Sequence, residues 1–232
     1  QAGLYETGAS LVVASNTTLQ VEPDGANTVM VIRPEHKPWT TREVAITVNA
    51  RQVSLAGPIE ILGFSSGPLP RVGEQLQTAI EIVASSEISV ANVKVYGFKG
   101  GNGVNVFGSK CISLTNLELV EIGDGIYPCK EKSTGGAGVR VEDSFRMDLH
   151  GIRAYALGRA GILALRSSDL SIVCVELGSI SPGCWGWGLG IRGGLLGAAA
   201  RGRGPRAACW PAHRARALAT RAAAWHPRPT GR

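Results

Sequence analysis

The chain has 232 residues, with 24 Lys and Arg against 18 Asp and Glu, and a formal net charge of +6. No run of eighteen apolar residues occurs, so the sequence indicates no membrane-spanning helix. Its five cysteines show neither a Cys-x-x-Cys spacing nor a Cys/His metal pattern. Residues 182–232 contain nine Arg and no Lys, Asp or Glu, so residues 1–181 hold 15 basic and 18 acidic residues. The basic charge therefore belongs to the C-terminal stretch.

The N-terminal third predicts short strands, because apolar residues alternate with polar ones there. The predicted strands are Leu11–Val13, Leu19–Val21, Val29–Ile32, Val44–Val48, Val53–Leu55 and Ile59–Leu62. The last of these fit the repeat described below only with a shift of one residue. The chain opens at Gln1 rather than Met, and no basic-then-apolar signal peptide is visible. We expect that the true N-terminus is missing.

The central stretch, residues 79–181, repeats one pattern four times. The copies begin with Ala-Ile-Glu-Ile at 79, Gly-Val-Asn-Val at 103, Gly-Val-Arg-Val at 138 and Gly-Ile-Leu-Ala at 161. Positions are counted from the second residue of each copy, taken as zero. The fifth position holds Ser in every copy, at Ser85, Ser109, Ser144 and Ser167. One copy carries an insertion at residues 124–137. Self-similarity at this period is typical of a solenoid.

Each copy contains three apolar-x-apolar pieces, at positions 0/+2, +8/+10 and +13/+15. A period of two indicates a strand whose apolar residues point inward, and stacked copies bury the face that a single copy cannot. Position +12 is Asn92, Asn116, Gly151 and Cys174, and Asn and Gly tolerate the left-handed backbone of a tight corner. Cys111 and Cys174 are interpreted as buried small apolar residues. The pattern predicts a parallel β-helix.

This coil layout resembles the pectin-lyase-like superfamily (pectate lyase superfamily) over residues 4–181. The short Asn corner, the variable third corner and the opening phrases at residues 6–13 and 15–19 carry the resemblance. It implies an all-β chain, a right-handed parallel β-helix with three short strands per coil over residues 1–181, incomplete at both ends. Residues 182–232 are predicted to form an irregular basic tail.

The tail has three interpretations. Gly, Ala and Arg make up most of residues 182–232, which we favour as out-of-frame or read-through translation of a GC-rich gene. A basic tail for nucleic acid or acidic glycans is the second interpretation. An Ala/Arg helix over residues 212–225 is the third. Without a motif, such a stretch is expected to be disordered.

The resemblance also implies where a site lies, in a cleft between the first sheet and the third-corner loops. By resemblance, Arg140 and Lys130 are the candidate catalytic residues. The candidate substrate-binding residues are Asn105, Asp124, Tyr127 and Glu142. An arginine fork suits a uronate carboxylate, and a lysine with a lowered pKa could serve as the base of a lyase.

The acidic residues allow two further chemistries to be compared with the sequence. Glu81, Asp124 and Glu142 could together hold Ca²⁺, which takes several oxygen ligands, although no metal site is assigned. Residues 122–126 resemble a polygalacturonase phrase, but only one Asp is present and no Gly-His-Gly motif follows. A pectin hydrolase, which needs paired carboxylates, is therefore not expected.

A purely structural interpretation stands beside the catalytic one. Position +14 alternates in sign as Lys94, Glu118, Arg153 and Glu176, which predicts a cross-strand ion ladder. Arg140 with Glu142 would then be another surface pair, and Asp148 with His150 an exposed polar strand face.

The leading functional prediction is a carbohydrate-active protein that binds an acidic polysaccharide and cleaves or epimerises it. The alternatives are a non-catalytic β-helix adhesin or surface-binding module, and an inactive fragment of a faulty gene model. The expected partner is a polysaccharide, with no membrane or nucleic-acid partner, and the chain is expected to be a monomer. A secreted or cell-surface location is expected.

Overall fold

The computed structural model describes residues 3–7, 11–21, 30–34, 44–63, 77–98, 101–123, 136–158, 160–180 and 187–192. All regular elements in these ranges are strands, and they form two sheets. The first, sheet A, contains β1 (Gly3–Thr7), β3 (Thr18–Gln20), β4 (Met30–Pro34), β6 (Arg51–Leu62), β8 (Ser86–Tyr96), β10 (Lys110–Val120), β12 (Phe145–His150), β13 (Arg153–Leu157), β15 (Ser168–Val173) and β16 (Glu176–Ile180). The second, sheet B, contains β2 (Leu11–Val13), β5 (Val44–Val48), β7 (Thr78–Val83), β9 (Val104–Phe107), β11 (Ala137–Glu142), β14 (Ala160–Leu165) and β17 (Trp187–Arg192).

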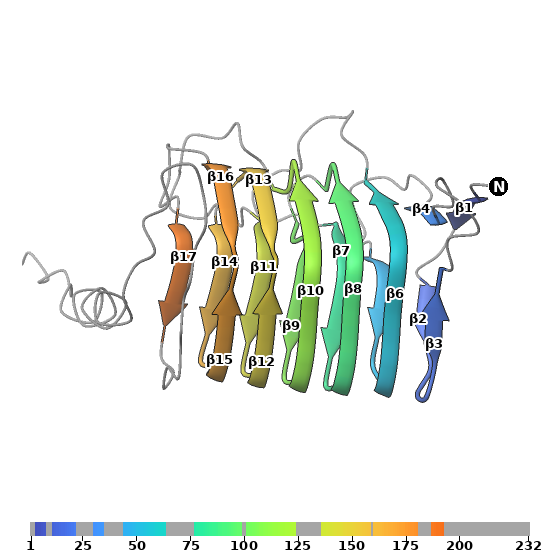
Figure 1. The fold of residues 1–232 in the computed structure, drawn as a ribbon, viewed down its shortest axis with the longest axis horizontal. Helices are drawn as coiled ribbons and strands as arrows, with labels where there is room; N and C mark the ends of the chain where they lie inside the picture. The colour runs from blue at the N-terminus through green and yellow to red at the C-terminus, as the bar shows by residue number, and fades with distance from the viewer. Residues whose placement is uncertain are drawn as a thin grey trace, which may run out of the picture.

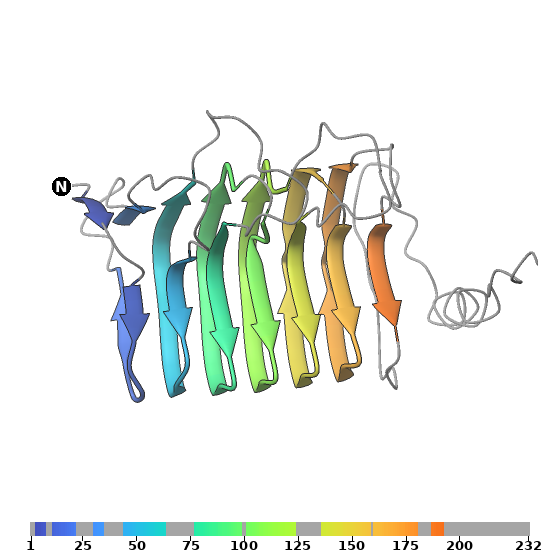
Figure 2. The same ribbon diagram turned by 180° about the vertical axis from the view of Figure 1, so that it is seen from behind.

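The two sheets pack face to face, and both extend along the long axis of the molecule (Figure 1). Sheet B runs β17-β14-β11-β9-β7-β5-β2, and the main path of sheet A runs β1-β4-β6-β8-β10-β12-β15. Every strand pair is parallel. The strands of sheet B point opposite to those of sheet A, as Figures 1 and 2 show from the two sides. Each coil therefore crosses sheet B once and returns through sheet A, as a parallel β-helix requires.

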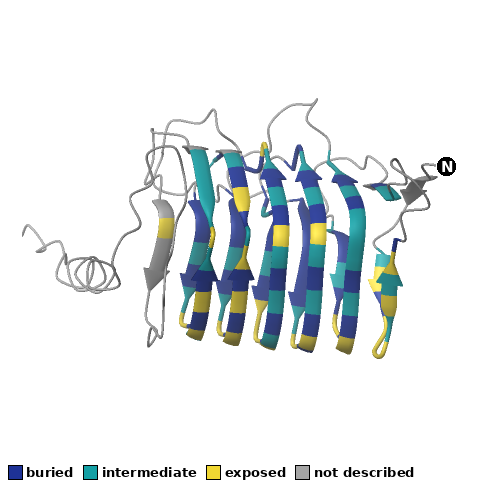
Figure 3. Ribbon diagram, in the orientation of Figure 1, coloured by how far each residue is buried: buried dark blue, intermediate teal, exposed yellow. Residues whose placement is uncertain are grey.

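The core lies between the sheets and is built from the predicted inward columns. Position zero aligns Ile80, Val104, Val139 and Ile162 in register on neighbouring strands, and each is completely buried. Buried and less buried residues alternate along the strands (Figure 3). Stacking like on like excludes water from both faces of each coil, which is why the repeat must recur to be stable.

Four stacked serines at position +5, one in each copy of the repeat, stabilise the corners after β7, β9, β11 and β14. This serine column consists of Ser85, Ser109, Ser144 and Ser167. The Oγ of Ser109 accepts from the backbone N–H of Ser85 at 3.1 Å, and Ser144 and Ser167 repeat the contact one coil further on. Ser109, Ser144 and Ser167 each donate to the carbonyl two residues earlier in their own coil. All four serines are buried. The column thus satisfies corner backbone groups that would otherwise be buried without partners.

The second and third predicted strands of a coil are less separate than expected. In β8 and β10 they form one strand that bends at Asn92 and Asn116, whose φ angles are 57° and 53°. At Gly151, with φ of 67°, and at Cys174, with φ of 54°, the corner divides the strand, into β12 and β13 and into β15 and β16. The left-handed corners were predicted correctly. The one-residue shift expected for the coil that ends at residue 62 appears as a register irregularity between β6 and β8, at Ala56–Ile59 of β6.

Two other expectations differ from the structure. Cys174 is exposed and Cys111 half-buried, because both occupy left-handed corner positions rather than inward columns. The β-helix was expected to end at residue 181, yet β17 continues sheet B by pairing with β14. Residues 193–232, the greater part of the predicted tail, lie outside the described residues.

Candidate functional site

The outer face of sheet B carries two rows of side chains that cross the strands. In the first row, strand register places Glu81 beside Asn105, Asn105 beside Arg140 and Arg140 beside Leu163. In the second row, Phe107 lies beside Glu142, and Glu142 beside Leu165. Parallel strands lie about 4.8 Å apart. Polar groups from three successive coils therefore form one continuous band.

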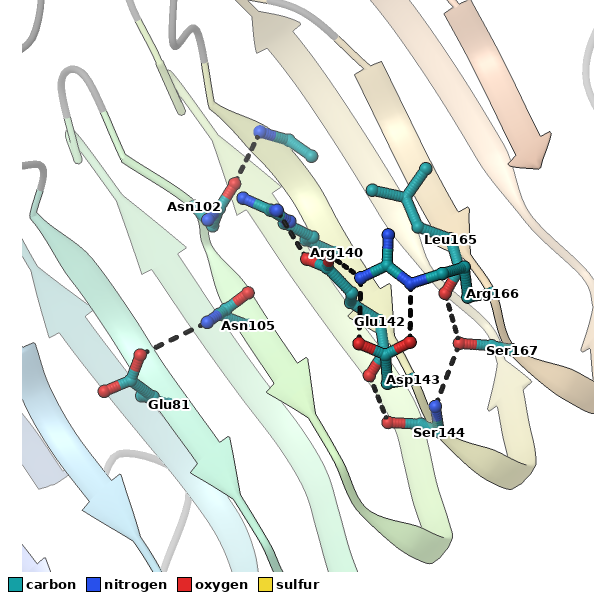
Figure 4. Close-up of polar contacts among 11 residues, drawn as sticks. Glu81, Asn102, Asn105, Arg140, Glu142, Asp143, Ser144, Leu165, Arg166 and Ser167 are labelled. Atoms are coloured by element: carbon teal, nitrogen blue, oxygen red, sulfur yellow. Dashed lines mark hydrogen bonds and ion pairs between the residues drawn. The ribbon is translucent and has the colours of Figure 1, made fainter. Parts of the chain in front are cut away.

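At the N-terminal side of the band, the side-chain amide of Asn105 donates to Oε1 of Glu81 at 3.2 Å (Figure 4). Phe107 lies two residues beyond Asn105 on β9, and its side chain is 44% exposed. An aromatic ring that is half open to solvent offers a flat apolar surface next to hydrogen-bonding groups. This combination suits a ligand with both apolar and hydroxyl-bearing faces.

Glu142 is held between two arginines. Nη2 of Arg140 donates to Oε2 of Glu142 at 2.5 Å, and Nη2 of Arg166 donates to Oε1 of the same carboxylate. The Glu142 side chain is only 14% exposed, whereas the Arg140 and Arg166 side chains are 38% and 59% exposed. Charge-assisted hydrogen bonds at both oxygens fix this carboxylate (Figure 4). Glu142 therefore orients Arg140 rather than pointing freely to solvent.

Arg166 also hydrogen-bonds Asp143, which lies at the corner of the preceding coil. Its Nε and Nη2 donate to the two oxygens of Asp143 at 2.7 and 2.8 Å. The hydrogen bond from Arg166 is the main cause that holds the pKa of Asp143 below its usual value, and Asp143 in turn raises the pKa of Arg166. Both residues have left-handed backbones, with φ of 49° and 46°. We call these two hydrogen bonds between Arg166 and Asp143 the fork. The fork lies at the end of the band, where the chain turns from sheet B toward sheet A.

Arg140 has one unusual feature. Its Nε is buried and has no hydrogen-bond partner among the described groups. Since guanidinium carries five N–H donors and one of its nitrogens is occupied by Glu142, the described residues satisfy the group only in part. Unsatisfied buried donors are rare in folded proteins and require a reason.

Three of the six predicted site residues lie together in this band: Asn105, Arg140 and Glu142. The other three, Asp124, Tyr127 and Lys130, fall outside the described residues, so their places stay predictions. In the described part of the chain, no three His, Cys, Asp or Glu residues are grouped so that they could hold a metal ion. The Ca²⁺ prediction depended on Asp124, which those ranges do not include.

The structure adds Asp143 and Arg166, which were not predicted. They occupy position +4 of neighbouring copies, where the other copies have Ala84 and Gly108. Opposite charges that replace two small residues in one corner column were the available sequence signal.

The predicted ion ladder is present in register, as Lys94, Glu118, Arg153 and Glu176 lie on successive strands of sheet A. The one ion pair measured along it, within the described ranges, joins Nε of Arg153 to Glu176 at 3.8 Å. Asp148 and His150 are exposed, as expected. None of the described elements is a helix that could cross a membrane.

No protein-family model and no curated protein matches the sequence. Among solved structures, a candidate glycosyl hydrolase from Parabacteroides merdae is similar, with a TM-score of 0.55 and 12% identity over 76% of this chain and 78% of that one. The Dettilon tailspike protein has a TM-score of 0.45 and 16% identity over 89% of this chain and 40% of its own. The A-module of the Azotobacter vinelandii mannuronan C-5 epimerase AlgE4 has a TM-score of 0.24 and 11% identity over 90% and 89%. The fold is a right-handed parallel β-helix of the pectate lyase type.

Proposed function

We propose that the protein is carbohydrate-active, binds an acidic polysaccharide along the outer face of sheet B, and acts on it as a lyase or an epimerase. The observation that carries this proposal is the band in which Asn105 and Arg140 lie on adjacent strands beside the exposed ring of Phe107. The fold similarity to a candidate glycosyl hydrolase supports a polysaccharide partner.

Arg140 is the proposed receptor for a uronate carboxylate. Its guanidinium is fixed by Glu142 yet still 38% exposed, so donors remain on its open side. A bidentate contact from arginine would neutralise the sugar carboxylate. Neutralisation makes the neighbouring C5 proton easier to remove, which is the first step shared by lyases and epimerases. Asn105 would bind a hydroxyl, and Phe107 would pack against a sugar ring.

Hydrolysis fits the band less well than proton abstraction. A glycoside hydrolase needs one carboxyl group that is protonated and can donate to the leaving oxygen. The carboxylates of Glu142 and Asp143 both accept from arginine, and the pKa of Asp143 is lowered. A carboxyl group whose oxygens accept from arginine and whose pKa is lowered, as in Asp143, is a poor general acid. The base would be Lys130. Asp124 and Tyr127 would line the cleft beside sheet B that the family resemblance implies. Bound Ca²⁺ is proposed as an aid to carboxylate binding.

The test is an incubation of the full chain with pectate, alginate and hyaluronan, with and without Ca²⁺. Unsaturated uronides would be followed by absorbance, and C5 inversion by proton NMR. We expect product from one polymer, strong loss in Arg140→Ala, and partial activity in Arg140→Lys. Arg146→Ala is the matched control, because Arg146 is an exposed arginine on sheet A, where it pairs with Asp169 at 3.7 Å and lies over the ring of Phe145. Equal product from the wild type and Arg140→Ala would refute the assigned role of Arg140.

A second candidate is binding without catalysis, as in an adhesin or surface module. It is favoured by the internal neutrality of the cluster, since Arg140 and Arg166 are matched by Glu142 and Asp143. In that case the polymer would bind without yielding either product, as affinity electrophoresis would show. A secreted or cell-surface location, proposed for either candidate, would bring the protein to such polymers.

A further inference from the structure

A second surface feature lies on sheet A, away from the band described above. Strand register places Arg153 beside Glu176, and Tyr155 beside Gly178, on the neighbouring strands β13 and β16. A Cβ placed on Gly178 would lie 2.9 Å from Cδ1 of Tyr155 and 3.3 Å from Cε1. The ring of Tyr155 therefore covers the space that any other residue at 178 would fill.

The hydroxyl end of the same ring lies beside the Glu176 carboxylate, which is two residues before Gly178 on the same strand. Burial, and after it the influence of this carboxylate, raises the pKa of the phenol, so the hydroxyl stays protonated and can donate. One edge of the ring therefore lies against Gly178 of β16. Tyr155 follows the buried Ala154 on β13, so its side chain lies on the outer face of sheet A, where it is half-buried.

The same column holds a second tyrosine two coils earlier. Register aligns Tyr96 with Val120 and Val120 with Tyr155. The phenol of Tyr96 likewise has a carboxylate beside it, that of Glu121, which raises the pKa of the phenol. Two strand spacings separate the rings by about 10 Å along the helix axis. That separation matches the length of a disaccharide unit, and it favours an extended chain ligand.

The charges beside the two tyrosine rings indicate which kind of polymer this surface could bind. The adjacent column alternates as Glu60, Lys94, Glu118, Arg153 and Glu176 along successive strands. A polyanion or polycation would meet repulsion at every second coil, whereas a neutral chain meets donors and acceptors in turn. The C–H faces of pyranose rings pack on aromatic rings, and the half-exposed Arg153 and Glu176 can bind the equatorial hydroxyls.

We propose that the outer face of β8, β10, β13 and β16 is a binding surface for a neutral polysaccharide, with Tyr155 and Tyr96 as its stacking platforms. This surface is distinct from the sheet B band and takes an uncharged rather than an acidic glycan.

The test is affinity electrophoresis of the full chain in gels that contain soluble β-glucan, galactomannan or xylan. We expect retardation by at least one of them. Tyr155→Val should weaken it about tenfold, and Val120 shows that this column accepts valine. Gly178→Ala should also weaken it, because the methyl group displaces the ring while Tyr155 remains. Tyr155→Phe should keep most of it.

Phe145→Ala is the matched control, since Phe145 is an exposed aromatic residue on sheet A. It lies beside the start of β10, whereas Tyr155 lies beside the end of that strand. Circular dichroism would establish that each variant is folded. Arg140→Ala should leave this binding unchanged, which separates it from the function proposed for sheet B. The proposal is overturned if no neutral polymer retards the wild type, or if Phe145→Ala weakens retardation as much as both Tyr155→Val and Gly178→Ala.

Discussion

At the scale of single residues, the serine column shows how one hydroxyl stabilises two coils. Ser144 Oγ accepts from the backbone N–H of Ser109 at 3.1 Å and donates to the carbonyl of Glu142 at 2.8 Å. Ser144→Ala leaves both buried groups without that partner, and we expect a loss of about 1–3 kcal/mol in the free energy of unfolding. Urea denaturation would measure it. Ser171→Ala, on the exposed face of β15, should change stability by less than about 0.5 kcal/mol. Equal effects would contradict the buried role of the column.

The Asp143–Arg166 fork predicts a specific dependence on pH. The folded-state pKa of Asp143 lies below the usual 3.8 because Arg166 hydrogen-bonds the carboxylate. Its contribution to stability is therefore present above pH 3.8, and is lost as the pH falls through the lower folded value. Carboxyl carbon NMR should give a midpoint below 3.8 for Asp143, moving upward in Arg166→Gln. An unchanged midpoint in that variant would show that the fork does not set the titration.

Thermal unfolding provides the matching stability profile. Asp143→Asn should lower the melting temperature at pH 7 and lose its effect in strong acid. Asp169→Asn should have little effect at either pH, because its pair with Arg146 is longer, at 3.7 Å, and exposed on both sides.

Residue roles were predictable where they recur in every copy, and not where they occur once. Four serines at one position identified a column that proved to be buried and hydrogen-bonded. The hydrogen bonds from Arg166 to Glu142 and Asp143 depend on the direction in which the Arg166 side chain leaves its corner. That direction follows from a left-handed backbone, which no pattern in the sequence fixes for arginine.

At the scale of the element, the corner between the two parts of sheet A depends on left-handed residues. Gly151 has φ of 67°, and a Cβ there would lie 2.5 Å from Oδ1 of Asn116 in the preceding coil. Gly151→Ala should therefore destabilise by about 1–2 kcal/mol from the backbone alone, and by more from the clash. Denaturant unfolding would measure the change.

A double-mutant cycle separates the two causes. Asn116→Gly keeps the left-handed corner and removes the side chain that an alanine at 151 would meet. In the Asn116→Gly background, Gly151→Ala should cost only the backbone term. If the two costs simply add, the steric contact does not limit this corner.

The strands themselves were predictable because the inward columns are apolar in every copy. What the pattern did not distinguish is whether a corner interrupts hydrogen bonding. Asn116 bends β10 without ending it, whereas Gly151 separates β12 from β13. The difference lies in local ladder geometry, which apolar spacing does not report.

At the scale of the whole molecule, stacking explains why one sheet face can be assigned to ligands. Each coil places its outward residues one strand spacing from the next, so a linear polymer along the axis meets the same positions repeatedly. The sequence placed Asn105, Arg140 and Glu142 on one face for this reason. The structural interpretation also named Arg140 and Glu142 as a surface pair, and the structure confirms that they pair. That interpretation did not predict Arg166 as the second partner of Glu142.

The C-terminal limit of the solenoid gives the last prediction. The strand β17 pairs with β14 from Ala160–Trp187 to Leu165–Arg192, beyond the predicted limit at residue 181. A chain that ends at residue 181 would leave unpaired the N–H and C=O groups of β14 that face β17, while those that face β11 stay paired, and such an edge promotes association. It should therefore melt at a lower temperature than a chain ending at residue 192, and elute in a larger, concentration-dependent form on size exclusion. A chain ending at residue 186, which lacks only β17, should behave like the shorter one. Identical melting and elution of all three would show that β17 does not support the solenoid, and would restore residue 181 as its boundary.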